Sequence, residues 1–350
     1  MDSRKIQTVG GGTYTVSLPK SWARAQSLEA GSVVDLHTHV DGVLVVEARE
    51  TDDGAGRVEV AVEDQRPVHL EQTLRAAYAA GASTVRFEAA GEFTEAQSRR
   101  IQSVTRTMTG VTIDERTATQ ITVQSLVDAA EVSIPQSVRQ LAFVALSMHR
   151  DATAALAGDG GPDIADRDDQ ADRLAAMVER HFGRALARLD EVDALGQRRP
   201  ELLDCRRTAC ELERVADHAE RIATTAAALD APPAESVDAL TDLAQRARTV
   251  VEDGVGVVVD RRAAGAARDV LDRRDGVRER AAAIERRLVD GADGDYRLVR
   301  VLDSLRRTAE HGGNIAEAGL RGAVRRGDHR DPVRSQREGS AVDAASDAGS

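Results

Sequence analysis

Residues 164–180 (IADRDDQADRLAAMVER) and residues 270–286 (VLDRRDGVRERAAAIER) align without a gap. Further along, residues 217–223 (DHAERIA) align with residues 310–316 (EHGGNIA) in the same order. Apolar positions in these stretches recur at the spacing of an amphipathic helix. A motif pair that occurs twice in one chain is typical of a duplicated helical unit. The repeat therefore predicts two tandem helical bundles in the second half of the chain.

The helical pattern runs from about Ser133 to Arg325 and is interrupted at a few places only. The interruptions are rich in Gly and Pro: 158–162 (GDGGP), Pro200, Pro232-Pro233, the surroundings of Gly265, and 291–294 (GADG). Such residues end helices. They predict six long helices, grouped as three-helix repeats over residues 133–230 and 234–325. Residues 326–350 are rich in Gly, Ser, Asp and Arg, and we expect them to be a disordered tail.

The sequence pattern of the first half of the chain predicts strands as well as helices. Residues 1–50 are strand-like, with a short helical turn at 20–26 and two β-rich runs joined by Asp41-Gly42, a hairpin signal. Residues 51–56 (TDDGAG) indicate a linker. Residues 57–124 form a small α/β unit, with alternating helix and strand patterns from 66 and a closing hairpin over 111–124. The fold class predicted is multidomain: a small β-rich swapped-hairpin domain, a small α/β unit and all-α tandem bundles.

Composition limits the classes of function. The 350 residues carry a net charge of −12, which excludes a globally basic nucleic-acid binder but not a local basic patch. Lys5 and Lys20 are the two lysines, so nearly all basic residues are Arg. An acidic chain poor in Lys fits a cytoplasm of molar salt, and a GC-rich genome would favour the same bias. With no long apolar run and no apolar leader at the start, we expect no membrane insertion and a cytoplasmic location.

Two pairs of carboxylates stand out in the first repeat. Asp168 and Asp172 are four residues apart on one predicted helix, and Glu213 and Asp217 are four apart on the next. Residues at this spacing lie on one helix face with Cβ atoms about 5–6 Å apart. Such close carboxylates repel unless a cation lies between them or water screens them, and hard cations prefer oxygen ligands. An acidic pair in an acidic chain is also common on solvated helix faces.

The sequence around these acids resembles the motifs of a known family. Residues 213–223 (ERVADHAERIA) resemble the signature of the PhoU family of phosphate-signalling proteins, and residues 167–173 (RDDQADR) are similar to its second acidic motif. The resemblance covers both helical repeats. It implies two three-helix repeats, negative regulation of phosphate uptake and phosphate homeostasis, and divalent or ferric metal binding. If the family's acidic motifs are transferred to the matching positions of this chain, the metal ligands would be Asp168, Asp172, Glu213 and Asp217.

The second repeat departs from that pattern. Arg274, Arg278 and Arg306 stand where the first repeat has Asp168, Asp172 and Glu213, and Glu310 alone keeps its acid. Because Arg supplies positive charge among carboxylates, an Arg–carboxylate network is expected there. We therefore predict one metal site at most, in the first repeat. The equivalent residues His218 and His311 lie about 100° round the helix from the acids, so a packing or surface role is expected for them rather than ligation.

Residues 5–46 resemble a second family, the AbrB/SpoVT swapped-hairpin DNA-binding domains. The match includes the Leu18-Pro19-Lys20 turn, the turn over residues 28–31 and the terminal hairpin. This resemblance implies a homodimer through the amino-terminal domain and basic residues set against promoter DNA. Residues 1–28 contain four positively charged side chains and one negatively charged one, Asp2. The four positive residues are the predicted DNA-binding residues: Arg4, Lys5, Lys20 and Arg24. The alternative is a module that only dimerises.

No catalytic signature is present. Neither lysine is preceded by the glycine spacing of a P-loop, and no nucleophile elbow or zincin motif occurs, so we expect no enzyme. Cys205 and Cys210 point to different helix faces and are expected to be free thiols. The function expected is a DNA-binding transcriptional regulator of phosphate uptake with a metal-binding helical half. The alternative is an adaptor that docks on a phosphate ABC transporter or a sensor kinase without binding DNA; a metallohydrolase has no placed base or nucleophile.

Overall fold

The computed structural model describes residues 3–38, 42–48, 56–63, 65–158, 164–230, 232–290 and 295–328. By its internal contacts the chain divides into two units, Met1–Ala55 and Gly56–Ser350. The expected linker at 51–56 and tail at 326–350 lie mostly outside the described residues. The finer boundaries expected within the second unit stay predictions.

The first unit is built from short strands and one short helix. Antiparallel strands β1 (Gln7–Val9) and β2 (Thr13–Thr15) form one hairpin, and β3 (Val34–Thr38) and β4 (Leu44–Ala48) form another. Helix α1 (Lys20–Ala25) follows Pro19, whose fixed φ suits the start of a helix. The second hairpin is the one predicted around Gly42, which has a positive φ of 75°. Asp41 itself is outside the described residues.

The second unit begins with a four-stranded sheet. Its strands are β5 (Arg57–Val62), β6 (Thr84–Ala89), β7 (Val111–Arg116) and β8 (Gln120–Ser125), in the order β5-β6-β8-β7. Strands β5 and β6 are parallel, joined through α2 (Pro67–Ala79), while β8 is antiparallel to both of its neighbours. The predicted closing hairpin is β7–β8. Strand β5 was not predicted, although Val58, Val60 and Val62 alternate as a half-buried strand requires.

One core fills the space between this sheet and its helices. Helices α2 and α3 (Glu95–Arg106) pack together, and α3 begins with a capping box made by Thr94 and Gln97. The fully buried side chains of this core come from both layers: Leu70, Leu74, Phe87, Ile101 and Ile121. Ala176 of the following helical part packs against it, so the sheet and the helices share an interface.

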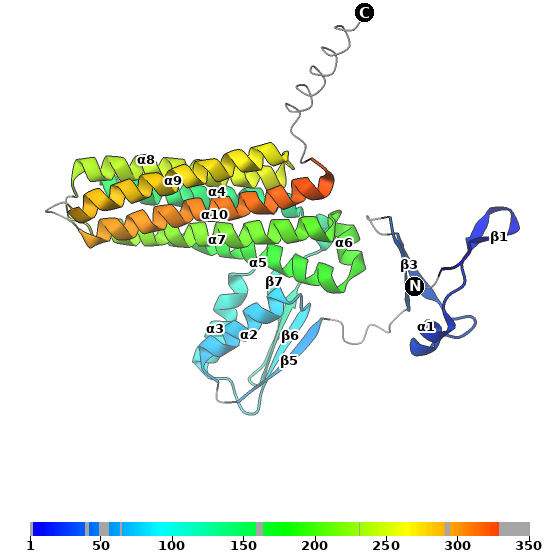
Figure 1. Cartoon of the computed structure of the whole chain (residues 1–350). Coiled ribbons are helices and arrows are strands. Elements are labelled where there is room, and N and C mark those ends of the chain that lie inside the picture. Colours follow the sequence, from blue (N-terminus) through cyan, green and yellow to red (C-terminus); the bar gives the residue numbers. More distant parts are fainter. Residues whose placement is uncertain are drawn as a thin grey trace, which may run out of the picture. The chain divides into compact units, whose positions relative to one another are not determined.

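The rest of the unit is helical (Figure 1). Within the described residues there are the six long helices that the sequence predicts: α4 (Ile134–Ala154), α5 (Ala165–Ala187), α7 (Arg199–Ala227), α8 (Ala234–Val259), α9 (Ala264–Asp290) and α10 (Tyr296–Arg326). A seventh, short helix, α6 (Leu189–Leu195), was not predicted. Among the described residues, no helix combines the length and apolar character of a membrane span.

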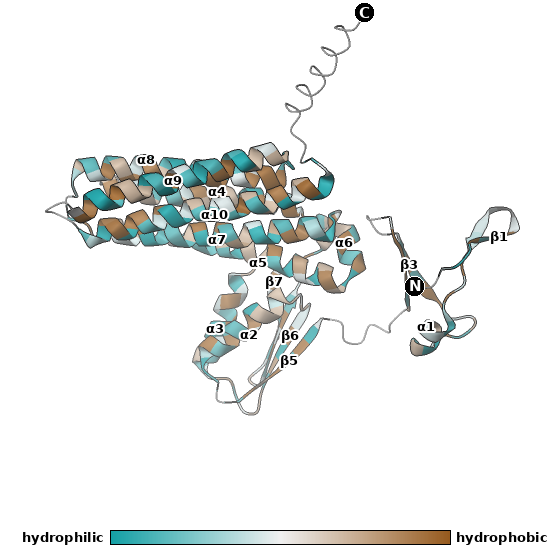
Figure 2. Cartoon of the chain, in the orientation of Figure 1, coloured by the Kyte–Doolittle hydropathy of each residue, from teal (hydrophilic) through white to brown (hydrophobic). Residues whose placement is uncertain are grey.

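The helices pack as two groups of three that join along α7 and α10. Helices α4, α5 and α7 contact one another, α8, α9 and α10 do the same, and α10 also packs on α7. Figure 2 shows teal and brown residues on different sides of these helices, as amphipathic packing requires. Helices α8 and α10 approach closely at Gly254 and Gly312, where a Cβ at Gly312 would lie 2.7 Å from the backbone N of Val251. Glycine is required at that crossing.

Helix α5 is tied to the α/β part by the buried guanidinium group of Arg180. Arg180 is 1% exposed and donates to the backbone carbonyls of Tyr78, at 3.0 Å, and Ala82, at 2.7 Å. Arg184 donates to the carboxylate of Glu191 at 2.8 Å, and His181 Nδ1 lies 2.6 Å from the same carboxylate. These contacts satisfy charge and carbonyl groups that burial would otherwise leave unpaired.

Candidate functional site

The four predicted acids lie on two packed helices of the first repeat. Asp168 and Asp172 stand on α5, Glu213 and Asp217 stand on α7, and the two helices contact each other (Figure 1). All four side chains are half-buried. We call these four residues the acid face. Long uninterrupted helices hold each pair one turn apart, because α5 and α7 contain no Gly or Pro near these positions.

The acids influence one another's protonation. Burial, and then the charges of Asp172, Glu220 and Asp217, raise the pKa of Asp168 to about 6. Burial also raises the pKa of Glu213, with added effects from Asp217 and Asp172. Because carboxylates on one helix raise the pKa of those on the other, the two pairs share one electrostatic site. A site of this kind favours a bound cation or a retained proton.

Residues outside the predicted set also act on this site. Burial raises the pKa of Asp172, the guanidinium of Arg75 on α2 lowers it, and Asp217, Asp169 and Glu220 raise it again. Glu220 continues the helix face of Glu213 and Asp217 by one further turn, so extending the helical spacing would have found it. Arg75 comes from the α/β part, and no local pattern on α5 or α7 points to it.

The acid face supplies oxygen donors only, which is the ligand chemistry that hard divalent or ferric cations prefer. In the described part of the chain, no three His, Cys, Asp or Glu side chains are already arranged to hold a metal ion. The carboxylates are thus electrostatically coupled without forming a finished cage. Metal binding by Asp168, Asp172, Glu213 and Asp217 stays a prediction.

The second repeat has the expected Arg–carboxylate network at corresponding positions. Arg274 lies 2.9 Å from the carboxylate of Asp275 and 3.5 Å from that of Glu317. Asp303 on α10 pairs with Arg306 at 2.5 Å and with Arg307 at 3.0 Å. Positive side chains therefore neutralise these carboxylates without a metal ion.

The two equivalent histidines pack between the repeats, which is one of the two roles expected for them. The rings of His218 on α7 and His311 on α10 stack with centroids 5.3 Å apart. His311 Nδ1 lies 2.6 Å from a carboxylate oxygen of Glu211, and the same oxygen accepts from the amide of Asn314 at 3.0 Å. Cys205 and Cys210 are free, also as predicted.

The four predicted DNA-binding residues are all at the surface of the first unit. Arg4 and Lys5 precede β1, whereas Lys20 and Arg24 are one turn apart on α1 and lie on one face of it. Within the described residues of this unit no side chain is buried. Many of its large apolar side chains are exposed: Ile6, Val9, Tyr14, Val16, Leu18, Val33, Leu36, Val43 and Leu44. A unit that leaves this much apolar surface exposed lacks a core of its own.

Comparison with known proteins gives a relative for each unit. Residues 138–226 match the family model described as the PhoU domain, a range that contains all four residues of the acid face. Residues 7–53 match the model described as antidote-toxin recognition MazE, a bacterial antitoxin, and this range contains Lys20 and Arg24. No curated protein matches the chain.

Two solved structures are similar to a little over half of this chain. The phosphate transport system regulatory protein PhoU from Streptococcus pneumoniae is 18% identical, with a TM-score of 0.47, over 57% of this chain and 96% of that one. PhoU from Pseudomonas aeruginosa is also 18% identical, with a TM-score of 0.41, over 54% of this chain and 94% of that one. The resemblance noted in the sequence is confirmed by the two family matches: the chain contains a PhoU domain and, at its amino end, a MazE/AbrB-like domain.

Proposed function

We propose that this protein regulates phosphate homeostasis by binding promoter DNA through its MazE/AbrB-like unit and a metal ion through its PhoU domain. It would act in the cytoplasm and negatively on phosphate uptake. The observation that carries the proposal is the pairing of these two domains in one chain, one matched over residues 7–53 and the other over residues 138–226. A DNA reader joined to a phosphate-related regulatory domain is the composition of a transcriptional regulator.

The exposed apolar side chains of the first unit support a homodimer. Burial of apolar surface contributes about 25 cal/mol per Å², so a second copy that covers these residues would stabilise the unit. The same arrangement would double the number of cations available to phosphates. Lys20 and Arg24 on one face of α1 are suited to such contacts because phosphate binding dominates affinity for DNA.

The acid face supports the metal part of the proposal. Burial and the charges of neighbouring carboxylates raise the pKa of Asp168 and Glu213, so the four half-buried acids carry unfavourable repulsion at neutral pH, which a divalent or ferric ion would relieve. Asp168, Asp172, Glu213 and Asp217 would hold the ion, which supplies positive charge there. We propose one such site at most, since Arg side chains neutralise the acids of the second repeat.

Fluorescence anisotropy with labelled promoter fragments tests the DNA role. The full chain should bind DNA from its own promoter or from phosphate-transporter promoters more tightly than a scrambled fragment, with affinity falling as salt rises. The double variant Lys20→Gln/Arg24→Gln should lose about tenfold or more in affinity. The matched control is Arg57→Gln, which removes an exposed cation from β5 in the other unit.

The rival function is an adaptor whose first unit serves only dimerisation. The PhoU domain would then dock on a phosphate ABC transporter or on a sensor kinase. The same titration separates the two functions. Absence of sequence preference at every salt concentration, with a dimer retained in sedimentation analysis, would overturn the DNA-binding proposal in favour of the adaptor.

A further inference from the structure

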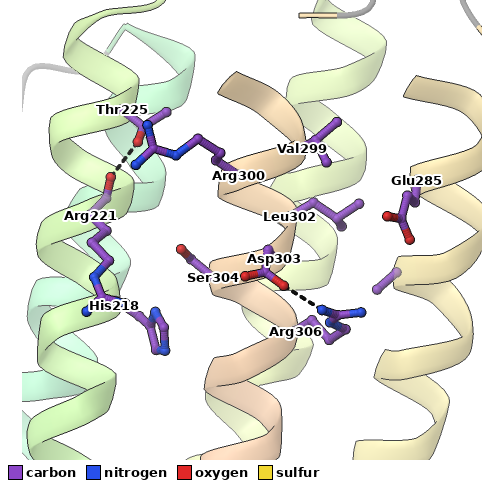
Figure 3. Close-up of a pocket in the computed structure, with 11 residues that line it drawn as sticks. His218, Arg221, Thr225, Glu285, Val299, Arg300, Leu302, Asp303, Ser304 and Arg306 are labelled. Atoms are coloured by element: carbon purple, nitrogen blue, oxygen red, sulfur yellow. Dashed lines mark hydrogen bonds and ion pairs between the residues drawn. The ribbon is translucent and has the colours of Figure 1, made fainter. Parts of the chain in front are cut away.

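A cavity of about 430 Å³ lies outside the acid face, where α7, α9 and α10 meet. Figure 3 shows its lining: His218, Arg221 and Thr225 from α7, Glu285 from α9, and a series of residues from α10 that includes Arg300, Ser304, Asp303 and Arg306. Neither the sequence motifs nor the family matches assign a role to this cavity. It combines three guanidinium groups with hydroxyl groups on one concave surface.

The charge of the lining is positive in a chain that is acidic overall. Arg306 pairs with Asp303, and so does Arg307 beside it. Among the residues that the structure describes, Arg221 and Arg300 have no carboxylate within ion-pair distance. Glu285 stands exposed on the α9 side. Although the protein has 59 acidic residues, no carboxylate pairs with Arg221 or Arg300 in the described structure, so the cavity has an excess of positive charge.

Buried polar atoms in the lining also lack partners. His218 is only 5% exposed, and its Nδ1 has no hydrogen-bond partner in the described structure. Nε of Arg306 is buried and unpartnered as well. Unpaired buried polar atoms cost about 1–3 kcal/mol each, so a ligand that hydrogen-bonds to them is favoured over an empty apolar space. Both atoms belong to residues that line the cavity.

We propose that this cavity binds a small tetrahedral oxyanion of the phosphate class. A guanidinium group presents a planar fork of donors that matches phosphate oxygens, and Arg221, Arg300 and Arg306 supply three of them from two helices. The hydroxyl of Ser304 and the imidazole of His218 add neutral hydrogen-bonding groups. The volume exceeds that of one phosphate ion, so it admits either free phosphate with water or the phosphate group of a small phosphomonoester.

Isothermal titration calorimetry on the full chain tests the cavity, with inorganic phosphate as the probe. The titrations contain EDTA, so that phosphate held by a metal ion on the acid face does not contribute. We expect one phosphate per chain, and a loss of about tenfold or more in affinity for Arg221→Gln/Arg300→Gln. Both residues are exposed and unpaired, so their substitution should leave the fold intact.

The matched control is Arg207→Gln, which removes an exposed Arg from α7 outside the cavity and should bind phosphate like the parent. A parallel titration with glycerol 3-phosphate separates the two sources of the ligand. Tighter binding of inorganic phosphate would identify free phosphate as the ligand, and tighter binding of glycerol 3-phosphate would identify a phosphomonoester. Absence of binding by either probe at millimolar concentration, or equal binding by the double variant and the parent, would overturn the proposal. Because neither DNA nor metal is present, that result would leave the proposed function untouched.

Discussion

In the first repeat, α5 carries Asp168 and Asp172 beside the acids of α7, whereas in the second repeat the matching positions of α9 carry Arg274 and Arg278. The backbone plan is the same, with three long helices in each group. The charge chemistry is opposite: one group concentrates carboxylates that repel, and the other pairs them with guanidinium groups. Duplication can therefore preserve a fold while only one copy keeps the four carboxylates of the acid face.

The largest expected difference between the repeats is in bound metal. Replacing Asp172 and Asp217 by Asn together should lower the metal content from about one ion per chain to below about a tenth of that, because hard cations need several oxygen ligands. Arg278→Ala in the second repeat should leave it unchanged. Elemental analysis of dialysed protein measures both. Equal metal content in the Asn variant and the parent would contradict the site.

A second difference lies at Arg180 and its repeat equivalent, Arg286. Arg180 is buried and donates to two carbonyls of the α/β part, while Arg286 is exposed. Arg180→Met should lower the free energy of unfolding by about 2–4 kcal/mol, since two buried carbonyls lose their donor. Arg286→Met should change it by less than about 0.5 kcal/mol. Urea unfolding measures both, and comparable losses would contradict the role given to Arg180.

The third comparison concerns helix packing. Ala219 on α7 corresponds to Gly312 on α10, where α8 approaches too closely for a Cβ. Gly312→Ala should destabilise the protein by about 1–3 kcal/mol through overpacking, although Ala is the better helix former. The control is Gly276→Ala on α9, which has open space around it and should stabilise by about 0.5–1 kcal/mol. Thermal unfolding that shows the same sign for both would contradict the close crossing.

The smallest expected effect depends on pH. The pKa of Asp168 is raised to about 6 in the folded protein, above its ordinary value of 3.8, so its charged form opposes folding. In metal-free protein this cost is full above pH 6 and disappears as the pH falls toward 4. Asp168→Asn should therefore raise stability at pH 7.5, by less than about 1 kcal/mol because the side chain is partly solvated, and should not do so at pH 4.5.

The control is Asp272→Asn, the same chemical change at an exposed acid on α9. Unfolding midpoints of the parent, Asp168→Asn and Asp272→Asn, measured in EDTA at both pH values, make the comparison. A stabilisation by Asp168→Asn that is the same at pH 4.5 and pH 7.5 would exclude repulsion as its cause.

Much of this architecture could be predicted from the sequence because its signals are local. The helix breaks at Pro200 and Pro232-Pro233, and the alternation that gives β7 and β8, depend on neighbouring residues only. Strand β5 escaped prediction because its six residues directly follow a Gly-rich stretch that indicates a linker. Its alternating valines were a usable signal.

The parts of the sites that could not be predicted depend on tertiary contact. Arg75 affects Asp172 only because α2 packs on α5. The cavity joins His218, Arg300 and Glu285 from three helices, and nothing in the local sequence of any of them indicates the others. In contrast, the acid face was accessible because helical periodicity places each pair, and the family resemblance relates one helix to the next.

Helix α5 carries two residues of the acid face, Asp168 and Asp172, in its first half, and Arg180, which binds the carbonyls of Tyr78 and Ala82, in its second half. Asp172 and Arg180 are about 12 Å apart along that helix, at 1.5 Å per residue. Because a continuous α-helix is stiff over this length, a movement of one part of α5 also moves the other part. A rotation of α5 about its own axis that moves Asp172 would therefore also move the guanidinium group that binds the carbonyls of Tyr78 and Ala82.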